Sequence, residues 1–255
     1  MISLDASSVL LQWATGGLLF LWVTTRHRMV GTGYGWLLRV VYLVLALGAF
    51  GFGAAFGFTP LRDLAALGVA LAAGFALVMS IVRRGVRVDA DGGFDPRLDL
   101  IAPAIGVVGL VGAAIDAGGP LWLSMARMLV GAAFIGAVSD AMLLGHWYLV
   151  QPGLGRSPLG ELVKWTGLIW LPEALLFLFG PGMVSVWSGA IDDHYNGMLG
   201  WFWGACVVTT IGLVAATLAA LKEPHYSAVM AATGLLYLAI LTGFGMDLVA
   251  RAILA

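Results

Sequence analysis

Long apolar runs separated by short polar breaks fill the chain of 255 residues. A hydrocarbon core of about 30 Å needs roughly 20 consecutive apolar residues in a helix that crosses it. Eight runs approach that length, at 8–25, 35–57, 61–82, 99–117, 121–149, 159–180, 197–221 and 226–252. Segments of about ten residues with alternating polarity, typical of a membrane barrel, do not occur. The pattern predicts an all-α, polytopic integral membrane bundle of about eight transmembrane helices.

The composition indicates the same class of protein. Hydrophobic residues make up 61% of the chain and charged residues only 11%, and the mean hydropathy is +0.98. One soluble core of this size could not bury so much apolar surface. We therefore expect residues 1–255 to form a single transmembrane domain in contact with the lipid bilayer.

The basic residues predict an orientation in the membrane. Ten of the 13 lie in or beside the breaks after the first, third, fifth and seventh runs: Arg26, Arg28, Arg39, Arg83, Arg84, Arg87, Arg97, Arg156, Lys164 and Lys222. Cytoplasmic loops carry an excess of Lys and Arg, so these four loops are expected in the cytoplasm and both termini outside. The first run lacks a basic segment before it and a cleavage pattern after it, so we expect a retained helix in a bacterial-type inner membrane.

Several kinds of site are excluded or disfavoured by the sequence. The single cysteine, Cys206, excludes disulfides, thiolate iron–sulfur ligation and c-type haem attachment within this chain. Motifs for nucleotide binding or familiar hydrolysis are absent. The segment from Asp89 to Asp95 has the spacing of the first calcium ligands of an EF-hand, but Ile101 stands where the final glutamate is required. We expect a solvated turn there.

The two halves of the chain share a faint similarity. When the second half is aligned with the first at three different offsets, the first, second and fourth runs match the fifth, sixth and eighth. The third and seventh runs do not match convincingly. The first and fifth runs cross in the same direction, so the pattern predicts a parallel 4+4 repeat of residues 1–118 and 119–255, with chance as the alternative. The aligned residues are Ala14, Gly17 and His27 with Ala133, Gly136 and His146; Gly35, Arg39 and Leu43 with Gly160, Lys164 and Leu168; and Leu110, Gly112 and Asp116 with Leu241, Gly243 and Asp247.

Three histidines fall on the predicted cytoplasmic side: His27, His146 and His225. Two imidazoles that face each other at one depth, each with its second nitrogen held by a partner, make a bis-histidine haem or metal site. The alternative is a set of interfacial residues, because arginines flank His27 and an aromatic pair follows His146. We take the three as candidate residues for a b-type haem or a quinone, and both interpretations stay open.

Two charged residues inside predicted spans are expected to meet. Arg127 and Glu173 each lie about seven residues inside the same end of consecutive spans, which usually pack as antiparallel neighbours. A charge within the hydrocarbon is costly when it has no partner, so we predict an Arg127–Glu173 pair. Pro172 removes a helical donor beside Glu173 and predicts a kink there. The pair fits a proton or ligand site and also a structural lock between two helices.

Asp140 differs because no basic residue lies one turn away from it. A carboxylate in that position either holds a proton or hydrogen-bonds to polar groups or water. Arg127 is about 20 Å away along the same helix, at 1.5 Å per residue. Asp140 is thus our first candidate for handling protons, with Glu173 and Arg127 as further candidates on a proton or ion pathway. Asp247 and Arg251 share one helical face and predict a structural pair.

These features support three hypotheses about function. The first is an electron-transfer subunit of a larger complex, with haem or quinone near the cytoplasmic face and other membrane or peripheral subunits as partners. The second is a proton-coupled secondary transporter, based on the repeat, the kink predicted at Pro172 and Glu173, and Asp140. The third is a purely structural or assembly subunit. We expect no nucleic acid as a partner and no separate metal site.

Overall fold

The computed structural model describes residues 4–86 and 94–255, with the side chains of residues 84–86 left aside. Regular structure within the described residues is entirely helical: α1 Ala6–Thr25, α2 Thr32–Phe56, α3 Pro60–Val86, η1 Pro96–Leu100, α4 Ile101–Asp116, α5 Leu121–Trp147, α6 Ser157–Leu178, α7 Met183–Trp187, α8 Met198–Ala220 and α9 Tyr226–Leu254. Residues 89–93 of the turn predicted from Asp89 to Asp95 lie outside this description, as do the basic side chains of Arg84 and Arg87.

The predicted all-α fold of long apolar helices is confirmed within the described residues. Seven helical segments in the described residues are long and apolar enough to cross a membrane: α1, α2, α3 to Arg83, η1 together with α4, α5, α8 and α9. Helix α6 has 22 residues but is not among them. It carries Glu161, Lys164 and Glu173, which make it more polar than its neighbours. An eighth span therefore stays a prediction.

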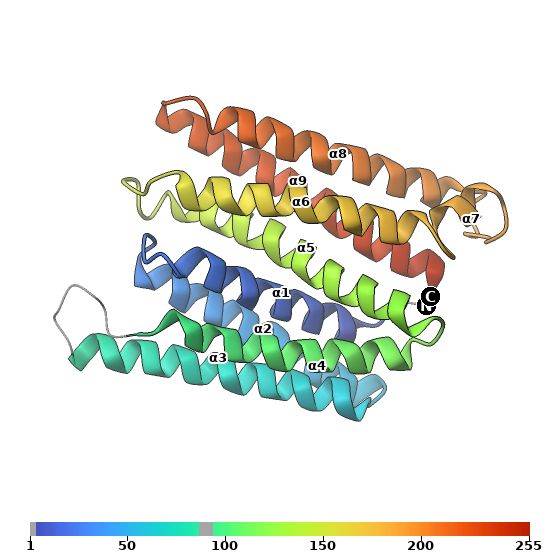
Figure 1. The fold of residues 1–255 in the computed structure, drawn as a ribbon, viewed down its shortest axis with the longest axis horizontal. Coiled ribbons are helices and arrows are strands. Elements are labelled where there is room, and N and C mark those ends of the chain that lie inside the picture. Colours follow the sequence, from blue (N-terminus) through green and yellow to red (C-terminus); the bar gives the residue numbers. More distant parts are fainter. Residues whose placement is uncertain (1–3, 87–93) are drawn as a thin grey trace.

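The long helices run roughly alongside one another in two groups (Figure 1). In the first bundle α1 packs on α2, α2 on α3 and α3 on α4, and α4 returns to α1. In the second bundle α5 packs on α6, α6 on α8 and α8 on α9, and α9 returns to α5. The bundles meet mainly along α1 and α5. The two central helices are therefore the contact surface between two closed four-helix groups.

The two ends of the molecule differ in charge. The chain turns after α1, α5 and α8 and the C-terminal end of α3 lie at one end (Figure 1), which we call the basic end because it carries Arg26, Arg28, Arg156 and Lys222. Both termini and the short helix α7 lie at the opposite end, which we call the acidic end. The separation of charge that the sequence predicts is thus present in the fold.

Proline and glycine mark many of the boundaries between helices. A proline lies in the first two positions of a helix, or within two residues before it, at Pro60, Pro96, Pro120, Pro158 and Pro224, where the missing N–H loses no helical bond. Gly197 adopts a φ of 80° just before α8. Asp193 caps that helix, because its carboxylate accepts from the backbone N–H groups of Gly197 and Leu199 at 2.7 and 2.9 Å.

Two glycines bring the central helices into backbone contact. A Cβ atom added to Gly136 of α5 would lie 2.1 Å from the carbonyl carbon of Gly16 in α1. One added to Gly16 would lie 1.7 Å from the carbonyl oxygen of Ala132. Small residues allow this close approach, as in many membrane helix pairs. The next residue, Gly17, leaves room for the ring of Tyr42, which would stand 2.0 Å from a Cβ there.

The two bundles share an order of neighbours but not the predicted residue register. Leu110 is fully buried, whereas its aligned partner Leu241 is 70% exposed. Arg39 is buried, whereas Lys164 is exposed. The common order agrees with a duplicated four-helix unit, and these aligned residues are not equivalent in environment. The repeat is therefore not confirmed.

Candidate functional site

Asp140 lies fully buried where the first and second bundles meet. The hydroxyl of Tyr42, from α2 of the first bundle, donates to its Oδ1 atom. Its Oδ2 atom and the hydroxyl oxygen of the neighbouring Ser139 are buried without a hydrogen-bond partner. Buried polar atoms are nearly always bonded, so two adjacent exceptions indicate a place that a proton or water can occupy.

A second tyrosine reaches the same residue from the basic end. The hydroxyl of Tyr34, near the start of α2, donates to the backbone oxygen of Asp140 at 3.3 Å. Thr24, near the end of α1, lies within hydrogen-bonding reach of the Tyr34 hydroxyl. Tyr34 and Thr24 are both buried. Asp140 thus has hydroxyl groups between itself and the basic end of the molecule.

The aromatic segment after Asp140 covers this group of hydroxyls. The ring of Trp147 packs edge-on against Tyr34, with centroids 5.8 Å apart. Its indole N–H donates to Oε1 of Gln151 at 3.2 Å, and the backbone N–H of Gly31 donates to the same oxygen at 3.1 Å. Gln151 therefore joins the turn after α1 to the turn after α5. Trp147 therefore covers Tyr34 in addition to lying near the surface.

Arg127 and Glu173 lie near enough to interact electrostatically, but they do not form the predicted direct pair. The Arg127 guanidinium donates instead to the backbone oxygen of Leu176, at 3.0 and 3.1 Å, and to that of Pro181, at 2.9 Å. The Leu176 carbonyl lies in the last turn of α6, where helical donors are missing, and the arginine supplies a donor to it and to Pro181 just after the helix. Both carboxyl oxygens of Glu173 are buried without a hydrogen-bond partner. The sequence pattern could not reveal this arrangement, because the carbonyl groups belong to every residue type.

The predicted Asp247–Arg251 pair is confirmed, in a setting that was not foreseen. Arg251 Nε donates to Asp247 at 2.6 Å, and both side chains are completely buried. The Arg251 guanidinium also bonds the side-chain oxygen of Gln12, and its Nη2 lies 3.7 Å from the sulfur of Met128. The Gln12 amide contacts Asp247 at 3.5 Å. Since Gln12 belongs to α1, this cluster joins the first bundle to the second near the acidic end.

The three histidines lie at the basic end with exposed side chains. Nε2 of His27 accepts from Arg26 at 3.0 Å, and Nδ1 of His146 lies 3.2 Å from the Tyr237 hydroxyl. His225 precedes α9, and its backbone oxygen accepts from Arg156 at 2.9 Å. These contacts do not bring the imidazoles together. Within the described residues, no three His, Cys, Asp or Glu side chains form a group that could hold a metal ion.

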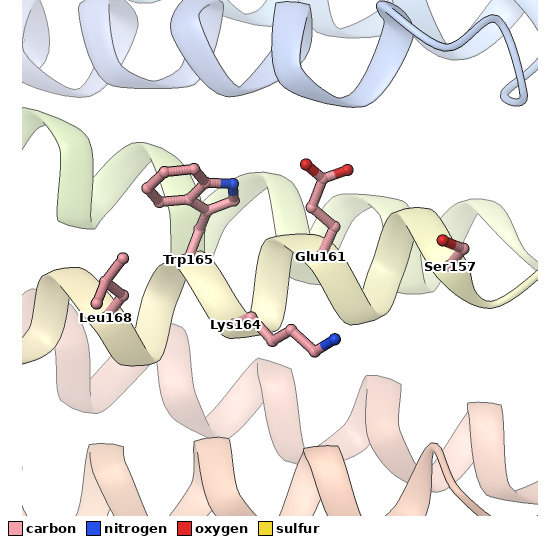
Figure 2. Close-up of a pocket in the computed structure, with 5 residues that line it drawn as sticks. All are labelled: Ser157, Glu161, Lys164, Trp165 and Leu168. Carbon is pink, nitrogen blue, oxygen red and sulfur yellow. The ribbon is translucent and has the colours of Figure 1, made fainter.

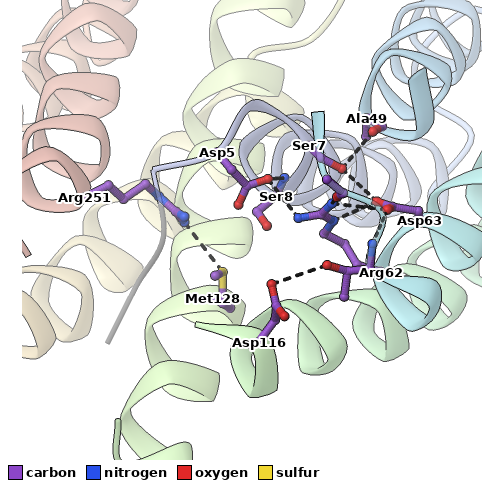
Figure 3. Close-up of polar contacts among 11 residues, drawn as sticks. Asp5, Ser7, Ser8, Ala49, Arg62, Asp63, Asp116, Met128 and Arg251 are labelled. Atoms are coloured by element: carbon purple, nitrogen blue, oxygen red, sulfur yellow. Dashed lines mark hydrogen bonds and ion pairs between the residues drawn. The ribbon is translucent and has the colours of Figure 1, made fainter. Parts of the chain in front are cut away.

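Other buried charges are paired within the first bundle. Arg39 donates twice to Asp99, each time at 2.7 Å, and joins α2 to the segment that precedes α4. At the acidic end Arg62 binds Asp63 at 2.7 Å and Asp5 at 3.0 Å, and Ser7 donates to Asp63 at 3.0 Å (Figure 3). These saturated contacts explain how the charges are stabilised.

Two open pockets accompany these clusters. One of 370 Å³ lies along α6, where the side chains of Glu161 and Trp165 rise on one side and Lys164 projects from the other (Figure 2). Glu161 pairs with Arg26 there. A second pocket of 690 Å³ at the acidic end is lined by charged and aromatic residues, among them Asp5, Arg62, Asp116 and Phe56. Neither contains Asp140, which is closed off from solvent.

Outside the membrane helices, Asp193 shows the effect of backbone donors on a carboxyl group. Desolvation acts to raise its pKa, but the N–H groups of Gly197, Tyr195 and Leu199 donate to the carboxylate and together lower the pKa below the usual value. The Asp193 carboxylate stabilises the start of α8. It lies in the segment between α7 and α8, which the sequence analysis did not connect with Asp140.

The comparisons with known proteins add no assignment: no protein-family profile, no curated protein and no solved structure matches the chain.

The sequence did not reveal three polar residues that bind the buried charges: Tyr42, Tyr34 and Gln12. Tyrosine and glutamine are common in apolar runs near membrane surfaces, so position alone did not separate them from interfacial residues. Their contacts with Asp140 and Arg251 in the folded protein distinguish them from interfacial residues.

Proposed function

We propose that this protein is a proton-coupled secondary transporter in which Asp140 binds the coupling proton. The observation that carries the proposal is the buried carboxyl group of Asp140, held by Tyr42 on one oxygen and without a partner on the other. Membrane carboxyl groups in such positions commonly serve proton relays. Asp140 also lies between two helix bundles, where alternating-access transporters place their coupling sites.

The contact between the bundles suits a rocking motion. Gly16 and Gly136 form a narrow backbone contact in its middle. The proposal includes eight membrane spans arranged as a parallel 4+4 repeat, with α6 as the eighth span. It also places the basic end in the cytoplasm and both termini outside, in a bacterial-type inner membrane.

Infrared spectroscopy tests whether Asp140 takes up and releases a proton. The wild-type protein in lipid is expected to show a carboxylic acid band that changes with pH, and Asp140→Asn should remove it. Asp192→Asn, which changes an exposed carboxyl group at the acidic end, is the matched control and should keep the band. An Asp140 band that does not change across the physiological pH range contradicts the proposal.

Transport is measured in parallel with the same variants. Solutes are screened in proteoliposomes for movement that also carries protons, reported by an enclosed pH-sensitive dye. Proton-coupled uptake by the wild type and by Asp192→Asn, with loss in Asp140→Asn, supports the assignment. Equal coupled uptake by Asp140→Asn would show that the coupling site lies elsewhere.

An electron-transfer subunit that binds a b-type haem or a quinone near His27 and His146 is the second candidate, with other subunits as donors or acceptors. The Tyr237 hydroxyl at Nδ1 of His146 favours it, because ligating histidines usually have their second nitrogen held by a partner. The Arg26 contact at Nε2 of His27 weighs against a bis-histidine pair. An optical spectrum of the purified protein without a Soret band would exclude the haem form.

A further inference from the structure

We infer that Asp140 exchanges its proton with the basic end of the molecule, through Tyr42 and Tyr34, beneath a cover made by Trp147 and Gln151. This inference rests on the proposed function and adds the route and the side from which the proton arrives. It assigns a role to two tyrosines that no sequence motif singles out.

The position of Asp140 along α5 gives the first argument. Asp140 is seven residues before the last residue of the helix, Trp147, and nineteen after its first, Leu121. At 1.5 Å per residue these separations are about 10 Å from the basic end and about 28 Å from the acidic end. The shorter route leads to the basic end.

The polar groups around Asp140 give the second argument. Tyr42 and Tyr34 reach it from α2, Thr24 adds a hydroxyl group from α1 beside Tyr34, and Ser139 lies next to it on α5. These four include the titratable groups that act on Asp140 from the helices packed against it. Tyr34, near the start of α2, and Thr24, near the end of α1, lie toward the basic end.

On the side of Asp140 that faces the acidic end, α1 and α5 come into backbone contact. Gly136, one turn from Asp140 in that direction, touches the backbone of Gly16. Ala137 on the same turn is fully buried. Helical backbone groups already bond to one another and cannot relay a proton, so this contact separates Asp140 from the Gln12–Arg251 cluster.

The transfer step keeps the tyrosine neutral. The Tyr42 O–H bond, which points at Oδ1 of Asp140, breaks as its proton forms an O–H bond to that oxygen. At the same time the Tyr42 oxygen accepts a proton from a hydronium ion that enters at the basic end beside the Tyr34 hydroxyl, and the hydronium ion becomes water. Release follows the same atoms in reverse. Trp147 and Gln151 cover Tyr34, so water enters only when their contacts with the turn at Gly31 loosen.

The test measures from which side Asp140 is protonated. In a Cys206→Ser background, one cysteine introduced at Met29 or Ser188 reports the orientation of the protein in liposomes with an impermeant thiol reagent. The infrared band of Asp140 is then followed after a pH jump on one side only. Protonation is expected to follow the pH at the basic end and to ignore a jump at the acidic end. The reverse result overturns the inference while leaving a titrating Asp140, and the proposed function, intact.

Variants test the route itself. Tyr34→Phe removes the hydroxyl group but keeps the ring and the side-chain partner of Asp140, so proton exchange should slow about tenfold or more. Tyr237→Phe makes the same change at an exposed position and should exchange like the wild type. Gln151→Ala, in the turn after α5, should speed exchange from the basic end because it releases the cover. Unchanged rates in both Tyr34→Phe and Gln151→Ala overturn the route, and a missing Asp140 band overturns both proposals.

Discussion

The first and second bundles are joined differently at the two ends of the molecule. At the acidic end the Gln12–Arg251–Asp247 cluster is buried from all sides. At the basic end Arg26 pairs with Glu161, and each side chain remains 30% exposed. A buried charge loses its hydration and depends on its partners, whereas an exposed pair exchanges its partner for water at little cost. The basic end is therefore the easier one to open.

This difference matters because Asp140 lies closer to the basic end. A motion that loosens Arg26, Glu161 and Gln151 would expose the cover over Tyr34 and leave the acidic end joined. The narrow glycine contact between α1 and α5 would serve as the pivot. Three substitutions probe the acidic end, the pivot and the basic end separately.

The largest effect is expected at the acidic end. Arg251→Leu leaves Asp247 buried without its 2.6 Å partner, and a broken buried pair typically costs about 3–5 kcal/mol. The free energy of unfolding, measured by denaturant titration in detergent, should fall by that order. Changing Asp247→Leu in the same protein removes the stranded charge and should restore part of the loss. If Arg251→Leu alone were as stable as the wild type, the acidic end would not be the more firmly joined of the two ends.

A smaller effect is expected at the pivot. Gly136→Ala places a Cβ atom against the backbone of Gly16 and forces α1 and α5 apart. The free energy of unfolding should fall by about 1–3 kcal/mol. Gly212→Ala is the control within α8, because a Cβ there meets nothing within 4 Å. Thermal unfolding of both variants gives the measurement. Equal melting temperatures would show that the helices are not held at backbone contact.

The smallest effect is expected at the basic end. Arg26→Gln should cost less than about 1 kcal/mol, because a partly exposed ion pair in water contributes little. The wild-type protein should also lose this contribution as salt is added, since exposed charges are screened. Unfolding titrations at low and high salt check both points. A loss as large as that in Arg251→Leu would remove the proposed difference between the ends.

Some features of the molecule were determined by the sequence alone. The apolar runs predicted the long helices to within a few residues, because a helix that faces lipid must keep its apolar surface over its whole length. The clustering of Arg and Lys predicted which turns share an end. The spacing of Asp247 and Arg251 predicted their pair, since four residues make one helical turn.

The partners of the buried polar groups were decided only by the tertiary structure. Arg127 was assigned to Glu173 by depth and charge, yet it binds the carbonyl groups at the end of α6. Asp140 was identified as unusual, but its link to Tyr42 depends on how α2 packs on α1, which in turn packs on α5. Helical periodicity fixes which residues share a face of one helix. The meeting of two faces depends on helix packing, and here on the absence of side chains at Gly16, Gly17 and Gly136.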